Sequence, residues 1–226
     1  MNTAVPLTPL DRQRWQLVLG TMALGMALIL LAARFHLGWK VAALSALLIN
    51  ALLLWHALAR KDALFLKLFV FGLVAGIAEL PSDWFSVSVK GVLSYPGGEP
   101  MVWTSPLYMP AGYSVLLVQF GWVGWRTLHR FGLAKSVLIT GVAGGAMVPV
   151  YEYLAHSANY WTYQNTAMLF NTVPYYIPAG EFVFMAAVPF MLRKLDRGGL
   201  GTATVLGVLE GAIMFVAWWA SFQLLQ

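Results

Sequence analysis

Cysteine is absent from the 226-residue sequence, and charged residues make up only 10% of it. Without cysteine the chain forms no disulfide, no thiolate metal site, no iron–sulfur cluster and no cysteine nucleophile. Soluble domains carry about 25% charged residues, so the low charge content argues against a soluble protein. The net charge of +5 would fit nucleic-acid binding, but the basic residues stand at the ends of apolar runs, where membrane topology is encoded. We therefore expect no nucleic-acid partner.

Several common active-site motifs are missing as well. The sequence has no Walker loop, no dinucleotide-binding GxGxxG and no nucleophile elbow of the hydrolases. Its four histidines are too few and too scattered for a histidine-rich di-iron oxidase. No lysine lies near the middle of the last apolar run, which excludes a retinal Schiff base. We expect no cofactor and no resident metal.

Hydrophobic residues make up 60% of the chain and form seven runs close to the ~20 residues that cross a bilayer. A short polar start, Met1–Leu10, precedes the first run, which is longer than the core of about 7–15 residues in a signal peptide. We therefore expect one all-α integral membrane domain over residues 1–226, folded as a seven-transmembrane helix bundle. The predicted spans are residues 15–33, 39–59, 63–80, 107–125, 136–153, 173–192 and 202–225.

Two breaks in this pattern are predicted around the third span. Pro81 should end or kink that helix, because proline lacks the amide donor and clashes with the preceding turn. Residues 85–105, which contain the turn signal Pro96-Gly97-Gly98, should form one long non-helical connection.

The distribution of basic residues predicts the orientation. Eleven Lys and Arg residues fall on the side of the N-terminus, and only Arg34, Lys40 and Lys90 fall on the other side. Cytoplasmic loops carry the excess of basic residues, so we expect a cytoplasmic N-terminus and a C-terminus outside. Residues 85–105 and 157–172 would then lie on the outer face. The expected location is the bacterial inner (plasma) membrane.

Three GxxxG pairs occur within the predicted spans. Small residues at this spacing let helices approach closely. A seven-helix chain must first pack against itself, so we expect internal packing rather than a dimer interface. The pairs are Gly72/Gly76, Gly141/Gly145 and Gly207/Gly211.

Acidic residues gather near the outer ends of the spans. At 1.5 Å per residue, Glu79, Glu152 and Glu181 fall at overlapping depth in the outer half of the membrane, with Asp83 just above them. Ionisable groups in a membrane are costly and usually functional. A carboxyl group in an apolar pocket keeps its proton and can act as a general acid. We interpret these four residues as catalytic, and Glu210, in the middle of the last span, as structural.

Aromatic side chains crowd around the acids. Aromatic belts mark the interfaces of any membrane protein, and aromatic faces also stabilise cations, so both interpretations stay open. The substrate-binding candidates are Trp84, Trp103, Tyr108, Tyr151, Tyr153, His156, Trp161, Tyr175 and Tyr176.

The order NYWTY (159–163) followed by NTVPYYIPAGE (171–181) resembles small integral-membrane isoprenoid enzymes. In heterodimeric-type lycopene cyclases and related carotenoid hydratases, a W-x-Y stretch precedes Val-Pro and an acidic or aromatic helix. The span number and membrane acids are also similar to those of meroterpenoid cyclases, small seven-span proteins that protonate an epoxide or olefin. The sequence departs from the carotenoid pattern because Tyr175-Tyr176, rather than paired acids, follow the proline. The resemblance implies a terpene cyclase, isomerase or hydratase-type lyase of carotenoid or terpenoid biosynthesis, with a role for Glu181.

Other interpretations stay open. Glu79, Glu152, His156 and Glu181 would suit one hard or borderline metal in a metal-dependent membrane enzyme. A non-catalytic subunit of a membrane complex would pair its acids with a partner chain. A transporter is disfavoured, because the sequence shows no repeats with matching broken helices. We expect a hydrophobic small-molecule substrate and membrane lipid as partners, and the oligomeric state stays open.

Overall fold

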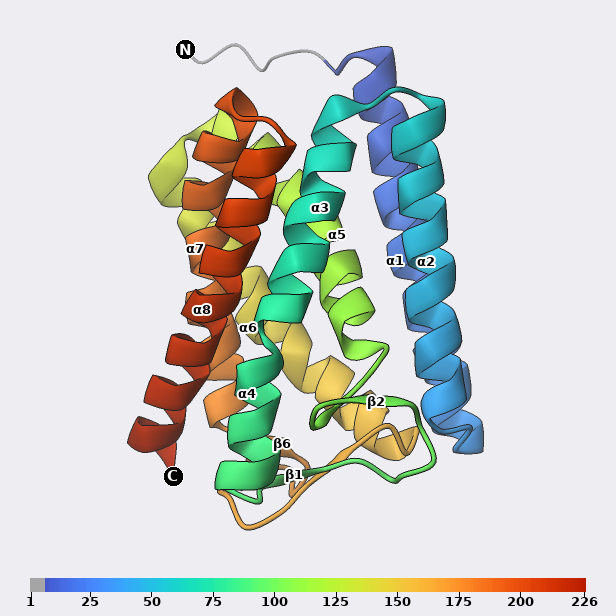
Figure 1. Cartoon of the computed structure of the whole chain (residues 1–226), viewed down its shortest axis with the longest axis vertical. Helices are drawn as coiled ribbons and strands as arrows, with labels where there is room; N and C mark the ends of the chain where they lie inside the picture. The colour runs from blue at the N-terminus through green and yellow to red at the C-terminus, as the bar shows by residue number, and fades with distance from the viewer. Residues whose placement is uncertain (1–6) are drawn as a thin grey trace.

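The computed structural model describes residues 7–226, and most of them are helical (Figure 1). A single π-helical turn, η1 (Phe85–Val89), extends the short helix α4. The α-helices are α1 (Pro9–Phe35), α2 (Trp39–Ala59), α3 (Ala63–Ala78), α4 (Leu80–Trp84), α5 (Met109–Phe131), α6 (Leu133–Ser157), α7 (Tyr176–Arg197) and α8 (Leu200–Leu225).

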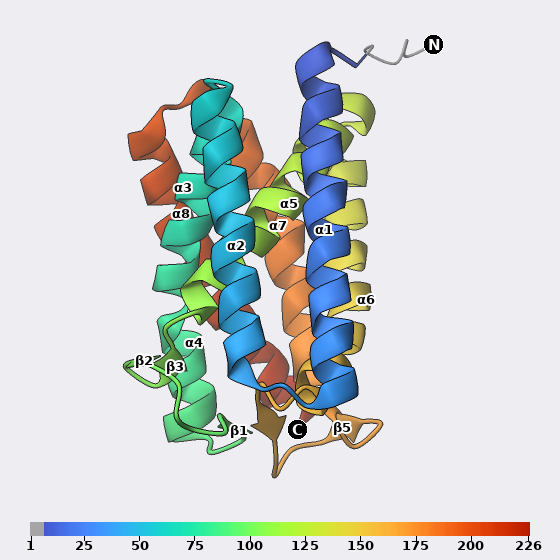
Figure 2. The ribbon, with the colours of Figure 1, turned by 90° about the vertical axis from the view of Figure 1, so that its right-hand side faces the viewer.

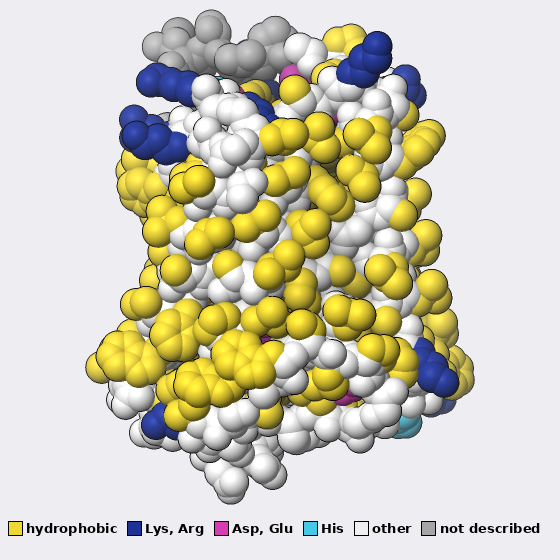
Figure 3. Space-filling model, viewed as in Figure 1, with side chains coloured by type: hydrophobic (Ala, Val, Ile, Leu, Met, Phe, Trp, Pro, Cys, Tyr) yellow, Lys and Arg dark blue, Asp and Glu magenta, His cyan; other side chains and the backbone are white. Residues whose placement is uncertain are grey.

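Within residues 7–226, five helical segments are long and apolar enough to cross a membrane: α1, α2, the continuous stretch Ala63–Val89, α6 and α8. Apolar side chains also cover much of the middle of the face seen in Figure 3, with Lys and Arg confined to its two ends. The protein is therefore an all-α membrane protein, as the sequence predicts. The other two long helices, α5 and α7, bury large side chains such as Trp122 and Phe184 completely. Because α5 and α7 contact protein along much of their length, they tolerate more polar residues than helices that face lipid.

The first helix begins earlier than the apolar pattern indicates. Thr8 caps α1: its hydroxyl accepts from the Asp11 amide at 3.1 Å, and the Asp11 carboxylate accepts from the Thr8 amide at 3.1 Å. Pro9 occupies the first turn, where its missing N–H is not needed. The prediction that Met1–Leu10 form a loose segment before the first helix is thus wrong for Pro9 and Leu10, which belong to α1. Residues 1–6 lie outside the described residues.

The third span is broken and then resumed. α3 ends at Ala78, and α4 begins at Leu80 with Pro81 in its first turn, which confirms the kink at this proline. The non-helical connection expected from Phe85 is wrong for its first five residues, because the π-helical turn Phe85–Val89 continues the rod.

Close helix packing follows the GxxxG pairs. A Cβ atom added at Gly76 would collide with the Pro110 backbone of α5, and one at Gly145 would lie 3.1 Å from the Pro178 carbonyl oxygen of α7. One added at Gly211 would lie 2.9 Å from the carbonyl oxygen of Ala75 in α3. The prediction of internal packing is therefore confirmed.

Six two-residue strands lie at one end of the bundle, opposite the start of α1 and beside the C-terminus (Figures 1 and 2). They belong to the connections 90–108 and 158–175, which together we call the cap. The antiparallel pair β1 (Leu93–Ser94) and β4 (Thr162–Tyr163) joins the two connections. The hairpins are β2 (Met101–Val102) with β3 (Ser105–Pro106), and β5 (Met168–Leu169) with β6 (Val173–Pro174).

Candidate functional site

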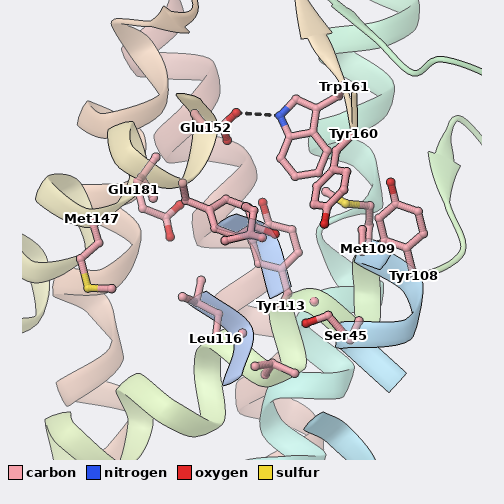
Figure 4. A pocket seen from close by; sticks show the side chains of 18 of the residues that line it. Ser45, Tyr108, Met109, Tyr113, Leu116, Met147, Glu152, Tyr160, Trp161 and Glu181 are labelled. Carbon is pink, nitrogen blue, oxygen red and sulfur yellow. Dashed lines mark hydrogen bonds between the residues drawn. The ribbon is translucent and has the colours of Figure 1, made fainter. Parts of the chain in front are cut away.

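A cavity of about 260 Å³ lies between α1, α2, α5, α6 and α7, beneath the cap (Figure 4). Its wall on the side of α1 and α2 is mostly apolar, with side chains such as Met22, Ile29 and Ile49, and includes the hydroxyl residues Thr21 and Ser45. Its wall toward the cap carries tyrosine, tryptophan and carboxyl groups. A mostly apolar pocket with a few convergent polar groups is typical of sites for small molecules.

Three carboxyl groups reach this cavity from three different helical elements. Asp83 comes from α4, Glu152 from α6 and Glu181 from α7, and the last two are seen together in Figure 4. All three side chains are buried. Within residues 7–226, none of them forms an ion pair with Lys, Arg or His. Three of the four acids predicted as catalytic therefore share one cavity.

Glu152 is held by the cap. The indole Nε1–H of Trp161 donates to Glu152 Oε2 at 2.6 Å, as the dashed line in Figure 4 shows. Trp161 itself is buried and packs against Tyr151 and Tyr160, with ring centroids 6.0 Å and 5.9 Å away. The indole therefore both lines the cavity and fixes the carboxyl group.

Asp83 is also held by the cap. The sequence places Asp83 just above the other acids, but the structure buries its side chain as fully as theirs. The Tyr95 hydroxyl donates to Asp83 Oδ2 at 2.6 Å, and the Ser105 hydroxyl donates to the same oxygen. Burial and the neighbouring Asp83 carboxylate raise the pKa of the Tyr95 phenol well above its ordinary value. Tyr95 therefore keeps its proton and remains a donor.

Glu181 differs from the other two acids because no cap residue holds it: Asp83 and Glu152 each accept a hydrogen bond from the cap, whereas Glu181 Oε1 is buried without a partner within residues 7–226. The side chain is 2% exposed and points into the cavity toward Tyr113 (Figure 4). It lies close enough to Glu152 for their charges to interact. Glu181 is thus the cavity acid that the cap does not fix.

The fourth predicted acid, Glu79, is buried but does not line the cavity. Neither of its carboxyl oxygens has a hydrogen-bond partner within residues 7–226, although its charge interacts with those of Asp83 and Glu181. Glu210 of α8 is buried in the same way, with its charge close to that of Glu181. These two acids lie behind the cavity wall.

The aromatic candidates divide into two groups. Tyr108, Tyr151 and Trp161 line the cavity. Trp84 and Trp103 stack on each other at 5.6 Å, and both are exposed.

The remaining candidates also lie away from the cavity. Tyr153 and Tyr175 are exposed, and Tyr176 is buried against Phe222. His156 is not part of the cavity wall.

Some cavity residues carry no clear signal in the sequence. Tyr95 sits in an irregular loop, and Tyr113 and Trp218 sit in helices among other aromatic residues. The only hint for Tyr95 is its place directly before the Pro96-Gly97-Gly98 turn, which does not predict the direction of its side chain.

A second cluster of buried charges lies at the opposite end of the bundle, and the sequence analysis did not identify it. Arg14 donates to both carboxylate oxygens of Asp62, at 2.8 Å and 2.7 Å, and to Asp11 at 3.0 Å. Its guanidinium lies 5.1 Å from the Trp122 ring centroid. Burial alone would raise the pKa of Asp62, but the Arg14 bonds and the Phe65 amide outweigh it and hold that pKa below its ordinary value.

No group of three or more His, Asp and Glu side chains suited to a metal ion is found in the part of the chain from residue 7 onward. The set proposed for a metal, Glu79, Glu152, His156 and Glu181, is therefore not assembled as a ligand cluster.

These observations define an α-helical membrane protein with an internal cavity that is apolar on one wall and acidic on the other. The chain belongs to the family described as Domain of unknown function (DUF6989), whose model matches residues 80–225. No curated protein and no solved structure matches the chain. The three acids of the cavity all lie in the matched region, whereas α1 and α2, which form the apolar wall, precede it.

Proposed function

We propose that this protein is an integral-membrane enzyme that protonates a carbon–carbon double bond of a lipid-soluble, isoprenoid-type substrate. The reaction class is that of cyclases, isomerases or hydratases, and it needs no cofactor. The observation that carries the proposal is the placement of Asp83, Glu152 and Glu181 in one apolar, aromatic cavity without a basic partner. Burying such isolated acids in a membrane protein costs free energy, and residues of this kind usually belong to a functional site.

Glu181 is assigned as the proton donor, because it lines the cavity and, unlike Asp83 and Glu152, accepts no hydrogen bond from the cap. The double bond takes the proton with its own electron pair, so that a C–H bond forms and a carbocation remains on the neighbouring carbon. The faces of tyrosine and tryptophan side chains stabilise this positive charge.

The reaction ends when the cation loses a proton or gains water. Asp83 or Glu152 accepts a proton from a carbon next to the cation, which forms a new double bond in a cyclase or isomerase. In a hydratase, water adds to the cation and gives up its proton to the same carboxylate. Both residues are already fixed by neutral donors, which suits a group that waits for a proton.

We further propose that the chain crosses the membrane seven times, with the N-terminus in the cytoplasm of a bacterial cell and the cap outside. The support is that all long helices run between the same two ends, and that Arg34, Lys40 and Lys90 are the only Lys or Arg residues toward the cap end. Topology is checked with single cysteines that replace the exposed Met101, Asn165 and Arg130. An impermeant thiol reagent should label the first two in intact cells; labelling of the third alone would reverse the orientation.

The substrate enters from the bilayer between α1 and α6. Met26 of α1 and Met147 and Tyr151 of α6 line the cavity and are also exposed, at 38%, 47% and 44%. The cavity of about 260 Å³ is smaller than the ~300–1,000 Å³ of typical ligand pockets, so a long isoprenoid extends through this opening into lipid. Methionine side chains adapt to such a flexible tail.

The first experiment identifies the bound molecule. Protein purified in mild detergent is extracted with organic solvent, and the extract is compared with that of a Met147→Trp variant, which narrows the opening. The proposal predicts an unsaturated isoprenoid-type lipid at near-stoichiometric amount, at least several-fold reduced in the variant. Recovery of bulk phospholipid alone from both proteins, or of a stoichiometric partner chain in place of lipid, would argue against it.

A further inference from the structure

Two donors to the cavity acids stand side by side in the cap. Tyr95 directly follows β1, and Trp161 directly precedes β4. In the antiparallel register Ser94 pairs with Thr162, so the next position of the ladder places Tyr95 opposite Trp161. Their rings pack edge to face with centroids 6.5 Å apart. The two side chains therefore form one cross-strand aromatic pair.

Each member of this pair holds an acid from a different helical element. Tyr95 donates to Asp83 of α4, and Trp161 donates to Glu152 of α6. The cap connections that carry the two donors are far apart in the sequence, and the β1–β4 pair joins them. Disturbing one strand should therefore move both acids.

The pairing itself is well defined despite its length. The Gln164 amide donates to the Val92 carbonyl oxygen at 2.9 Å, and hydrogen-bonded pairs alternate in an antiparallel ladder, so Ser94 and Thr162 form the next bonded pair. Their hydroxyl groups also lie 2.8 Å apart. Of the two cap hairpins, β2–β3 supplies Ser105 to Asp83, and β5–β6 supplies no donor to Asp83 or Glu152 within residues 7–226.

We infer that the β1–β4 pair is a positioning element that fixes Asp83 and Glu152 relative to each other, with Tyr95 and Trp161 as positioning residues. The inference rests on the proposed function, in that these two acids are the proton acceptors. It gives Trp161 a second role beside contact with the substrate, and it gives Tyr95 a role that the sequence does not indicate. Ser105, which also donates to Asp83, lies in β3 and contacts this acid from the β2–β3 hairpin, separately from β1–β4.

The structural part is tested by nuclear magnetic resonance of protein with 15N-labelled tryptophan indoles in nanodiscs. The Trp161 indole proton, assigned by its loss in Trp161→Phe, should resonate far downfield, because its donor lies 2.6 Å from a carboxylate oxygen. Ser94→Pro removes a ladder donor and should shift this resonance upfield. Ser94→Thr, which keeps the hydroxyl and the amide, and Leu169→Pro, which disturbs only β5, should leave it in place.

The catalytic part is tested with the substrate identified by extraction. Tyr95→Phe keeps the ring but removes the bond to Asp83, and it should lower kcat about 10- to 100-fold, as expected for a bond to a charged group, with KM nearly unchanged. Ser94→Pro should lower kcat in the same way, and the separate variant Ser94→Thr should keep normal turnover. If Ser94→Pro prevents the cap from folding, Tyr95→Phe still tests the inference, because it leaves the backbone of β1 unchanged.

The outcomes separate the inference from the proposed function. An unshifted indole resonance in folded Ser94→Pro, or normal kcat in Tyr95→Phe, would overturn the positioning role of β1–β4. The proposed enzymatic function would not be affected by either result. If the resonance shifts as expected but the unaltered protein converts no isoprenoid, the proposed function fails and the structural coupling through β1–β4 stands.

Discussion

At the end of the bundle where α1 begins, buried carboxylates face a guanidinium group. Asp62 is doubly bonded to Arg14, and Asp11 is bonded to Arg14 with Arg126 at 3.6 Å. At the cap end, the buried acids have neutral donors or none: Tyr95, Ser105 and Trp161 for Asp83 and Glu152, and no partner for one oxygen of Glu181. The two ends therefore bury acids in opposite electrostatic settings.

This difference separates structural acids from acids available for chemistry. A carboxylate fixed by two charge-assisted bonds to arginine keeps its charge and has little freedom to give or take a proton. A carboxyl group with only neutral donors has no fixed positive charge that holds it ionised, so it is able to take up and give up a proton. We therefore expect stability to depend on the Arg14 end and turnover to depend on the cap end.

The largest effect is expected for Glu181→Gln. Glutamine keeps the shape of glutamate but has no acidic proton, so turnover should fall at least about 100-fold, the lower range for loss of a general acid. Thermal stability should change little, because Oε1 has no partner to lose. Turnover is measured by product formation from the extracted lipid, and stability by melting in the same detergent.

Asp62→Asn serves as the matched control, since it makes the same kind of change at the other end. It should lower stability while each folded molecule turns over normally. If Glu181→Gln unfolds the protein and the surviving fraction keeps full turnover, the contrast between the two ends is lost.

Arg14→Met should cause the largest loss of stability. Removing one member of a buried, hydrogen-bonded ion pair typically costs about 3–5 kcal/mol, because the remaining charge stays buried. Asp62 would be that charge, since its side chain is fully buried. The double variant Arg14→Met with Asp62→Asn should recover part of the loss in a denaturation series. Equal stability of Arg14→Met and the unaltered protein would show that the pair is not structural.

A smaller loss of stability is expected when a close helix contact in the cap half of the bundle is disturbed. Gly76→Ala places a methyl group against the Pro110 backbone and should cost about 1–3 kcal/mol. Gly20→Ala in α1 meets nothing within 4 Å and should be neutral or stabilising by up to about 1 kcal/mol. Melting curves that rank the two variants in the reverse order would contradict the assigned packing of α3 on α5.

The smallest effect is a dependence of stability on pH. The folded-state pKa of Asp62 lies below its ordinary value of 3.8, so its ion pair stabilises fully above that pH and loses its effect as the pH falls through the folded pKa. The stability difference between the unaltered protein and Asp62→Asn should be constant above about pH 5 and shrink below pH 3.8. A difference that stays constant down to about pH 2 would contradict the role of Arg14 in lowering this pKa.

Much of the helical architecture is predictable, because each membrane-spanning helix requires an apolar run of about 20 residues that is visible in the sequence. The runs around residues 39–59 and 202–225 match α2 and α8 within two residues, and the GxxxG pairs correctly indicate internal packing. The start of α1 and the turn at Phe85–Val89 are not predictable from hydropathy, because they depend on a capping box and on a π-helical turn.

The candidate site is predictable only in part. Helix depth brings Glu152, Glu181 and Asp83 to one level, and these three residues do share a cavity. Depth does not predict the direction in which a side chain points, so Glu79 was included although it lies behind the wall. Tyr95 and the pairing of β1 with β4 depend on contacts between distant loops, which no local pattern contains.

The central claim is that a carboxyl group of the cavity transfers its proton to carbon, and incubation in deuterium oxide tests this most directly. A carboxylic proton exchanges with solvent, so the product formed from the extracted isoprenoid should carry one carbon-bound deuterium by mass spectrometry, and Glu181→Gln should form almost none of it. Product that accumulates at the normal rate in deuterium oxide without carbon-bound deuterium would contradict the account.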